Sequence, residues 1–254
     1  MDAAAGCAFI VGAPRSGTTL LRNLFRQDPR FLCPEETHFF RWIDPCCSTY
    51  FRDQLLHNPT LVHHRQLDGI SEAGFARLLD ESPSREALLF NYLQQLRSAR
   101  GLGEDTVFLE KTPQHVYSMA FIHAVLPQAR FIHLVRSPLN VVTSLVRGRQ
   151  FEPQPLQGAI NFWREAQLVA KSFADQHPDR VMRVRYEDLT QDPGTTMASL
   201  YAFLREPMPP GLDFSAVQPA QDSYREHLDL RQRTQVLSET RELAAALGYT
   251  GEGA

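Results

Sequence analysis

Lysine is nearly absent from this chain of 254 residues. Of its 26 lysines and arginines, only Lys111 and Lys171 are lysines, so arginine meets almost every need for positive charge. Arginine presents a planar fork of donors, whereas lysine is a compact point charge on a flexible stem. A lysine inside an apolar segment, as Lys111 is, therefore raises the question of why arginine would not serve there.

Long hydrophobic runs are also missing. No stretch approaches the roughly 18 to 20 consecutive apolar residues that a membrane span requires. Residues 1–6 carry an acid and no basic region ahead of their short apolar run, unlike a secretory signal. We therefore expect no membrane partner and a cytoplasmic location.

Metal-ligand and disulfide patterns are lacking as well. Cys7, Cys33, Cys46 and Cys47 have no CxxC spacing, and we interpret them as reduced packing residues. None of the nine histidines belongs to an HExxH or Cys/His pattern, so no metal is expected. The formal net charge of -3 argues against a protein held on nucleic acid by a basic surface, but it leaves room for a local phosphate site.

The length and the apolar pattern predict a single α/β domain over residues 1–254. With 43% hydrophobic residues, the chain can bury one sizeable core, and it is too short for two full domains with a linker. Short apolar, β-branched runs alternate with segments of helical spacing, which predicts a three-layer sandwich around a central parallel sheet. The expected strands are Cys7–Val11, Thr106–Leu109, Arg130–Val135 and Val181–Tyr186.

Capping and breaking residues mark several boundaries in the last quarter of the chain. Asp192 before Pro193 predicts the N-cap of a helix that runs to about Leu204. Four prolines within residues 207–219 predict a surface loop. A terminal helix is expected over residues 235–247, with a glycine stop.

A glycine-rich segment follows the first expected strand. Residues 12–19 read Gly-Ala-Pro-Arg-Ser-Gly-Thr-Thr and lead into a segment of helical spacing. In such strand–loop–helix units, free backbone N–H groups and the positive helix end face an anion. We therefore predict a phosphate cradle rather than an ordinary turn. The residues that supply its anion donors or its turn are Pro14, Arg15, Ser16, Gly17, Thr18 and Thr19.

The glycine spacing of this segment also matches a Walker A loop, but Thr18 stands where that loop has lysine. A kinase or ATPase would lack the cation that reaches the transferred phosphate, and no acidic strand end stands out as a magnesium ligand. Arg15 can instead supply positive charge from inside the loop. A kinase is therefore a disfavoured alternative, which an activity dependent on ATP and metal would revive.

Two segments together resemble the nucleotide site of sulfotransferases that use 3'-phosphoadenosine 5'-phosphosulfate (PAPS). The Pro-Arg-Ser-Gly-Thr-Thr loop is similar to the family's 5'-phosphosulfate loop. Arg136 at a strand end, with Ser144 eight residues later, is similar to its 3'-phosphate site, although Ser137 stands where the family has an aspartate. The resemblance implies the P-loop-like sulfotransferase fold and PAPS as co-substrate, with Arg136 and Ser144 binding the 3'-phosphate.

Two further segments carry the catalytic candidates. Lys111 lies at a strand end just before a helix, and strand carboxyl ends are where open α/β sheets bind ligands. The resemblance implies that Lys111 stabilises negative charge on the bridging oxygen of the leaving phosphate. The block Cys-Pro-Glu-Glu-Thr at residues 33–37 resembles Cys-Gly-Glu-Glu-Thr of the tyrosylprotein branch, which implies that Glu36 is the base for the acceptor hydroxyl. Glu35 fits a solvated helix start better.

Three residues nearer the C-terminus resemble functional residues of the family less specifically. Tyr186, in a Tyr-Glu-Asp-Leu segment, matches a tyrosine near the nucleotide, and it fits a core aromatic equally well. Ser223 matches a serine that helps catalysis in the tyrosylprotein branch. That branch has lysines where Tyr224 and Leu228 stand here, and Arg225 is a candidate to supply the missing cation.

The departures from the tyrosylprotein branch concern the acceptor. His38 and Trp42 stand where that branch has arginines that attract acidic peptides, and Leu109 replaces a cysteine that pairs with the match to Cys33. We therefore favour a hydroxyl of a small metabolite or carbohydrate over a peptide tyrosine. Residues 44–105 and 146–160 have no match to the family and are expected to form the acceptor pocket.

The sequence thus predicts a PAPS-dependent sulfotransferase that moves a sulfuryl group to a hydroxyl by in-line displacement, without a metal. Tyrosylprotein sulfotransferase is the alternative within the enzyme class. A catalytically silent nucleotide-binding module is the alternative outside it, and the joint presence of Glu36 and Lys111 argues against that alternative. The oligomeric state stays open, a homodimer included, as does closure of the 207–219 loop over the nucleotide.

Overall fold

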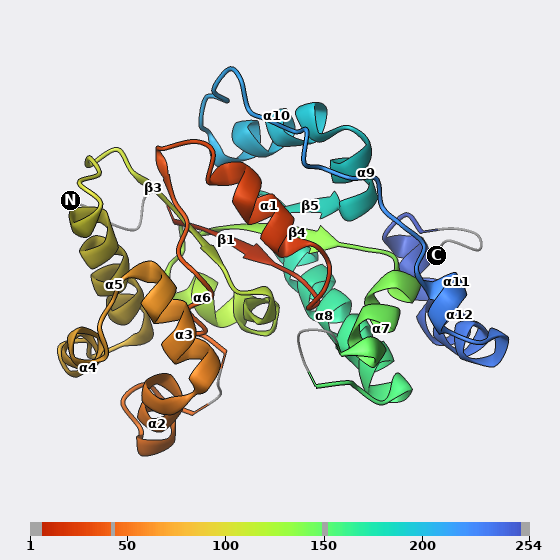
Figure 1. Ribbon diagram of the computed structural model, residues 1–254, viewed down its shortest axis with the longest axis horizontal. Helices are drawn as coiled ribbons and strands as arrows, with labels where there is room; N and C mark the ends of the chain where they lie inside the picture. Colours follow the sequence, from red (N-terminus) through yellow and green to blue (C-terminus); the bar gives the residue numbers. More distant parts are fainter. Residues whose placement is uncertain (1–6, 42–43, 149–151, 250–254) are drawn as a thin grey trace.

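The computed structural model of the protein describes residues 7–41, 44–148 and 152–249. Within these residues, a five-stranded parallel sheet forms the centre of the protein (Figure 1). The strand order is β2-β3-β1-β4-β5, and every neighbouring pair is parallel. The predicted α/β architecture is therefore confirmed. The strands are β1 (Cys7–Val11), β2 (Phe31–Leu32), β3 (Val107–Lys111), β4 (Arg130–Val135) and β5 (Val181–Arg185).

Helices connect the strands and cover the sheet. Those before β3 are α1 (Thr18–Phe25), α2 (Thr49–His57), α3 (Pro59–Asp68), α4 (Glu72–Asp80) and α5 (Arg85–Ala99). Between β3 and β5 lie the 3-10 helix η2 (Pro113–Ser118), α6 (Met119–Val125), α7 (Pro138–Arg147) and α8 (Leu156–Gln176). The chain continues with α9 (Tyr186–Gln191), α10 (Pro193–Leu204), α11 (Tyr224–His227) and α12 (Leu230–Ala246). Among the described residues, no helix is long and apolar enough to cross a membrane.

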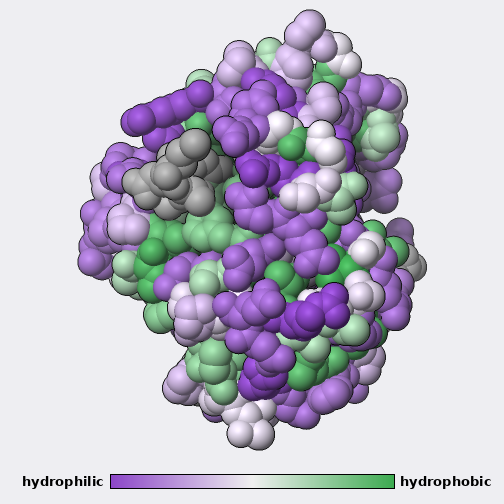
Figure 2. Space-filling view, turned by 90° about the vertical axis from the view of Figure 1, so that its left-hand side faces the viewer, coloured by the Kyte–Doolittle hydropathy of each residue, from purple (hydrophilic) through white to green (hydrophobic). Residues whose placement is uncertain are grey.

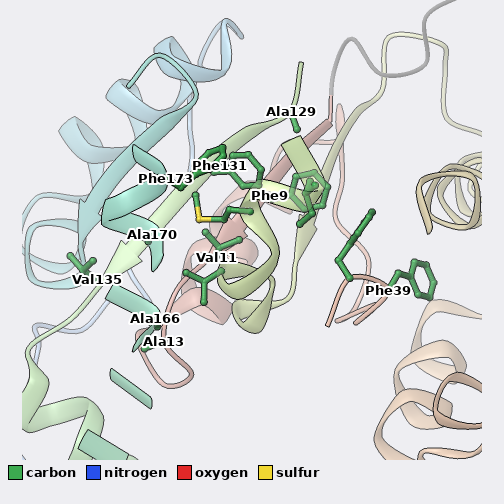
Figure 3. Close-up of a cluster of buried hydrophobic side chains, with 14 of the residues drawn as sticks. Phe9, Val11, Ala13, Phe39, Ala129, Phe131, Val135, Ala166, Ala170 and Phe173 are labelled. Carbon is green, nitrogen blue, oxygen red and sulfur yellow. The ribbon is translucent and has the colours of Figure 1, made fainter. Parts of the chain in front are cut away.

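The residues of β1 alternate between two hydrophobic cores, as the period of two along a strand requires. Ala8 and Ile10 belong to the core that contains side chains of α1 and α10. Phe9 and Val11 belong to the opposite core, which contains side chains of α8. Figure 3 shows this second core, where Phe9 stacks on Phe131 with ring centroids 5.6 Å apart. Helices therefore cover both faces of the sheet, which is the three-layer arrangement.

The predicted boundaries agree with the structure at most elements. The Asp192 carboxylate accepts a hydrogen bond from the Thr195 N–H at 3.0 Å and caps α10. The terminal helix begins at Leu230 rather than at residue 235, because Asp229 and Gln232 form a capping box there. Residues 207–219, all of them described, contain no helix or strand. The strand β2 was not predicted, because two residues are too few to show a period.

The helices α2 to α5 lie within residues 44–105, the first of the two stretches expected to form the acceptor pocket, on the left of Figure 1. Seen from that side, their surface is mostly hydrophilic with scattered apolar patches (Figure 2). Two buried arginines stabilise this layer. Arg65 of α3 donates to the carbonyl of Leu55 in α2 at 2.6 Å and joins the two helices. Arg85 of α5 donates to the Phe39 carbonyl at 2.6 Å, a charge-assisted bond that holds α5 against the segment that follows β2.

Candidate active site

The predicted motifs meet at one edge of the sheet. β1 ends at Val11 and leads into the glycine-rich loop, β3 ends at Lys111, and β4 leads into Arg136. Because the strands are parallel, their carboxyl ends lie together, at the place where such sheets bind ligands. A cavity of about 930 Å³ lies here, lined by Pro14, Arg15, Gly17, Thr18, Thr19, Glu36, His38, Arg41, Asn58, Thr60, Leu61, His64, Pro113, Gln114, Arg136 and Glu152.

The glycine-rich loop has the geometry of an anion cradle. A Cβ atom at Gly12 would lie 2.4 Å from the Leu134 carbonyl oxygen, so only glycine lets the loop approach β4 this closely. Gly17 has a φ of 95° and precedes α1 without a side-chain cap, which leaves the first N–H groups of the helix for a ligand. The Ser16 hydroxyl is buried and has no hydrogen-bond partner among the described residues. Unsatisfied donors around one turn fit a bound phosphosulfate.

Two arginines converge beside this loop. Arg15 donates from Nε to the Ser144 hydroxyl at 2.8 Å, and Arg136 donates to the Arg15 carbonyl at 3.5 Å. Burial and the charge of Arg136 lower the pKa of the Arg15 guanidinium. The Nε of Arg136 is buried without a hydrogen-bond partner in the described part of the chain. Two guanidinium groups and a hydroxyl in one place suit the charge and geometry of a phosphate.

Tyr186 completes this side of the site. The Arg136 guanidinium lies 4.3 Å from the centre of the Tyr186 ring, in a cation–π contact. The same ring occupies the space next to Gly17, where a Cβ would lie 2.3 Å from it. Tyr186 is half-buried at the start of α9 and lies between the loop and Arg136, rather than in a core. Tyr186 is therefore not the core aromatic that the sequence equally allowed, and its place near the nucleotide stays a prediction.

Contacts from distant segments position these groups. The Glu187 carboxylate accepts from the Ser137 N–H at 3.1 Å and from the Tyr249 hydroxyl at 2.6 Å. The Trp163 indole donates to the Arg136 carbonyl at 2.9 Å. The turn after β4 is thus held by α8, α9 and the end of the chain. No role was predicted for Glu187 or Trp163, because a contact with a distant backbone group leaves no local pattern in the sequence.

Glu36 and Lys111 form an ion pair at the edge of the cavity. The Lys111 ammonium contacts Oε1 of Glu36 and lies 3.4 Å from the Thr19 hydroxyl. Nε2 of His38 lies 3.3 Å from Oε2 of Glu36. Burial opposes ionisation of Glu36, but His38 and Lys111 outweigh it and hold the pKa of this carboxyl well below its usual range. Burial lowers the pKa of Lys111, and Glu36 partly offsets that effect.

A buried polar network holds the segment that carries Glu36. The Glu110 carboxylate is fully buried and accepts from the hydroxyls of Thr37 at 2.9 Å and Thr112 at 2.6 Å. Nδ1 of His115 lies 2.9 Å from the same carboxylate, and its Nε2 accepts from the Phe40 N–H at 3.2 Å. The proton of the neutral ring is therefore assigned to Nδ1, which donates to Glu110. The network flanks Lys111 in sequence and fixes the chain on both sides of the ion pair.

Glu35 differs from its expected place at a solvated helix start. No helix begins near it, and its side chain is 16% exposed, in ion pairs with Arg22 of α1 and with Arg26, the C-cap residue of α1. Its backbone N–H donates to the Asp68 carboxylate of α3 at 3.1 Å. The two arginines lie one helical turn apart, so they converge on one carboxylate. Glu35 thus anchors the segment and leaves Glu36 to face the cavity.

The structure does not bring Ser223 and Arg225 to the cavity lining. Ser223 immediately precedes α11, which packs on α7, and the neighbouring Asp222 accepts from Asn140 of α7 at 3.3 Å. Arg225 lies with its guanidinium 5.3 Å from the centre of the Tyr224 ring. The roles of Ser223 and Arg225 therefore stay predictions. Trp42 lies outside the described residues.

Replacing Glu110 with glutamine is expected to lower the free energy of unfolding by about 1 to 3 kcal/mol at pH 7, because buried donors lose their charged acceptor. Burial raises the pKa of Glu110, but His115, Thr112 and Thr37 together hold it below the ordinary value of 4.5. Its contribution is therefore present above the unfolded-state value and is lost as pH falls through the folded-state value. Urea denaturation at pH 7 and in acid checks both statements.

An equivalent change at Glu104, which lies exposed before β3, serves as the control and is expected to leave stability nearly unchanged. Equal stability of the Glu110→Gln and Glu104→Gln variants at pH 7 would contradict the assigned role of the network.

The fold and the site together define an α/β protein with a phosphate-binding loop, two converging arginines and a buried Lys–Glu pair. Residues 8–210 match the family model described as the sulfotransferase family, and the chain belongs to this family. The predicted resemblance to sulfotransferases is therefore confirmed, and protein-tyrosine sulfotransferases are among the relatives that the chain matches.

Characterised relatives share about a quarter to a third of the aligned residues. Protein-tyrosine sulfotransferase 1 of Danio rerio is 26% identical over 207 residues, which cover 78% of this chain and 53% of the relative. Nodulation protein NoeE of Sinorhizobium fredii is 31% identical over 143 residues, 54% of this chain and 30% of the relative. Omega-hydroxy-beta-dihydromenaquinone-9 sulfotransferase Stf3 of Mycobacterium tuberculosis is 26% identical over 246 residues, 77% of this chain and 62% of the relative. The chain thus spans less than two thirds of each relative's length.

Solved structures confirm the fold. The sulfotransferase domain of the Synechococcus PCC 7002 olefin synthase superposes with a TM-score of 0.67 at 23% identity, over 96% of this chain and 95% of that one. Mouse SULT7A1, solved with PAP, superposes with a TM-score of 0.55 at 12% identity, over 98% of this chain and 89% of that one. The P-loop-like sulfotransferase fold predicted from the sequence is therefore the observed one.

Proposed function

We propose that residues 1–254 form one sulfotransferase domain that transfers the sulfuryl group of PAPS to a hydroxyl of a polar acceptor. The observation that carries this proposal is the pair Arg15 and Arg136 beside an uncapped helix start, where Arg15 donates to the Ser144 hydroxyl and Arg136 donates to the Arg15 carbonyl. A loop that binds one phosphate group and a second site, formed by Arg136 and Ser144, that binds another suit a nucleotide with phosphate at both its 5' and 3' positions. ATP has no 3'-phosphate for the second site.

The two halves of the nucleotide have separate binding groups in this proposal. The backbone N–H groups at the start of α1 and the hydroxyls of Ser16, Thr18 and Thr19 hold the 5'-phosphosulfate. Arg136 and Ser144 hold the 3'-phosphate. Arg15 lies between the two sets, because it belongs to the loop and donates to Ser144.

The reaction is an in-line displacement at sulfur. The acceptor oxygen forms a bond to sulfur while the bond from sulfur to the bridging phosphate oxygen breaks, and the acceptor proton passes to Glu36. Lys111 stabilises the negative charge that develops on the departing phosphate. Lys111 pairs with Glu36 in the structure, so the charge of the nucleotide competes with Glu36 for the ammonium. Positioning and electrostatics supply most of the catalysis.

The part of the cavity beyond Glu36 supports a polar acceptor. Apart from Leu61, glycine and two prolines, the residues that line the cavity are polar, and they include His38, His64, Asn58 and Thr60. Such groups suit an acceptor with several hydroxyls, such as a carbohydrate or a small polar metabolite. Similarity to the protein-tyrosine sulfotransferase of Danio rerio keeps a peptide tyrosine as the second candidate. We also propose a cytoplasmic setting, which the four free cysteines support.

Calorimetric titration with 3'-phosphoadenosine 5'-phosphate (PAP), ATP and AMP, all without magnesium, tests the nucleotide half of the proposal. We expect PAP to bind with a Kd of about 1 to 10 μM and at least about tenfold more tightly than ATP, a difference near 1.4 kcal/mol. A screen of tyrosine peptides, phenols and glycans with PAPS then identifies the acceptor. Equal affinity for PAP and ATP would refute the proposal, and ATP-dependent, magnesium-dependent transfer would establish the kinase alternative.

A further inference from the structure

The two carboxylate oxygens of Glu36 have different partners. Oε1 contacts the ammonium of Lys111, which is buried below the cavity and is only 2% exposed. Oε2 lies 3.3 Å from Nε2 of His38, whose side chain is 4% exposed. In the proposed reaction the Lys111 ammonium turns to the departing phosphate. Glu36 therefore loses its contact with Lys111 when the nucleotide binds and keeps its contact with His38.

His38 is held in an unusual conformation that directs its ring to Glu36. Its φ is 57°, in the left-handed region, which is unfavourable for a non-glycine residue and persists only where the surroundings enforce it. Its N–H donates to the Thr112 hydroxyl at 3.3 Å, within the network around Glu110. Its ring is parallel to that of His64, with centroids 6.2 Å apart and planes 12° apart. The backbone of His38 is thus held by Thr112, and its ring lies against that of His64.

We propose, on the basis of the proposed function, that His38 is a positioning residue that keeps Oε2 of Glu36 in a hydrogen bond. Oε1, which Lys111 vacates when the nucleotide binds, is then the atom that takes the acceptor proton. The step moves one proton from the acceptor oxygen to Oε1 as the O–S bond forms. His38 neither gives nor receives a proton in it.

The charge state of His38 matters for this role. Burial lowers the pKa of His38, and Glu36 only partly offsets that effect, so the ring is neutral at pH 7 and donates its Nε2 proton. A neutral donor orients Glu36 while lowering its basicity less than a cation would. The titratable and charged groups that face the pair from neighbouring segments are Lys111 of β3, His115 of η2, His64 of α3 and Arg41.

Two substitutions at position 38 distinguish the loss of the hydrogen bond to Glu36 from a disturbance of the fold. Gln places its amide nitrogen three bonds from Cβ, as His places Nε2, so His38→Gln retains the donor. Asn places its amide nitrogen two bonds from Cβ, where His has Nδ1, so His38→Asn loses the contact with Glu36. Asn is also among the residues that tolerate a positive φ best, so it spares the backbone. Nδ1 of His64 lies 3.1 Å from the backbone carbonyl oxygen of Glu36, not from its carboxylate. His64→Asn removes the stacked ring and places an amide nitrogen where His64 has Nδ1, so it serves as the control.

The pKa of Glu36 in the PAP complex is the measured quantity. Protein labelled with carboxyl-13C glutamate is saturated with PAP and titrated by NMR, and the Glu36 signal is identified by its loss in Glu36→Gln. We expect the pKa in His38→Asn to lie about one unit above the wild-type value, because a hydrogen bond to the ionised form is lost. His38→Gln and His64→Asn are expected to stay within about 0.3 units of wild type.

If His38 had only a structural role, its variants would be less stable, but the pKa of Glu36 in the folded PAP complex would not change. An unchanged Glu36 pKa in His38→Asn, or equal rises in the Asn and Gln variants, overturns the inference. Failure of the proposed function has a different signature, because the wild-type protein would then show no preference for PAP over ATP in the calorimetric titration.

Discussion

Glu36→Gln is expected to lower turnover about 100- to 10,000-fold, the contribution of a well-placed general base. Glutamine keeps the shape of the side chain, and its amide oxygen still accepts from His38, but it takes up no proton. The Kd for PAP is expected to stay within about threefold, because Glu36 binds no part of the nucleotide and its loss frees Lys111 from the ion pair. Steady-state transfer to the acceptor found in the screen, with calorimetry of PAP, measures both quantities.

The neighbouring carboxylate is the matched control for this change. Glu35→Gln removes the same charge one residue away, but Glu35 is bound by Arg22 and Arg26 and does not line the cavity. Its turnover is expected to remain within about threefold of wild type, with some loss of stability. Near-normal turnover in Glu36→Gln, or an equal loss in both variants, would contradict the assignment of Glu36 as base.

Arg136→Ala is expected to weaken PAP binding about 100-fold or more, because truncating one partner of a buried charge pair costs about 2 to 5 kcal/mol. ATP and AMP have no 3'-phosphate, so their weak binding is expected to change little. The preference for PAP over ATP is therefore expected to disappear. Calorimetric titration of the three nucleotides without magnesium measures the change.

Arg136→Lys tests the geometry of the same contact. Lysine keeps the charge but lacks the planar fork and the ring contact with Tyr186, so an intermediate loss is expected. Arg183→Ala, on the exposed side of β5, removes an arginine outside the site and serves as the control. Full retention of the PAP preference in Arg136→Ala would show that the arginine pair does not bind the 3'-phosphate.

The sequence predicted an element correctly where one short segment contains all the residues that define it. The apolar runs at β1 and β4 predicted both strands with their correct ends, because burial on both faces leaves a continuous apolar stretch. The Asp192–Pro193 step predicted the start of α10, because cap and first turn are adjacent in sequence. The rarity of lysine singled out Lys111, which the structure places in an almost fully buried ion pair.

Contacts between residues far apart in the sequence could not be predicted from local patterns. The Arg15–Ser144 hydrogen bond joins residues 129 apart, and the Glu187–Ser137 bond joins residues 50 apart. Glu35 and Glu36 are identical neighbours in sequence. Their different environments come from α1 on one side and from β3 on the other. The helices α2 to α4 were not predicted individually, because their residues match no family motif.

The sequence by itself determined the family, the parallel sheet and the glycine-rich loop after β1, because each depends on short-range order along the chain. Tertiary structure alone decided which groups meet at the candidate site. It placed Arg15 with Arg136, buried Glu110 beside the segment that carries Glu36, and divided the oxygens of Glu36 between Lys111 and His38. The physical reason is that hydrogen bonds and ion pairs depend on distances in space, which packing of the helices and strands sets, and not on separation in sequence.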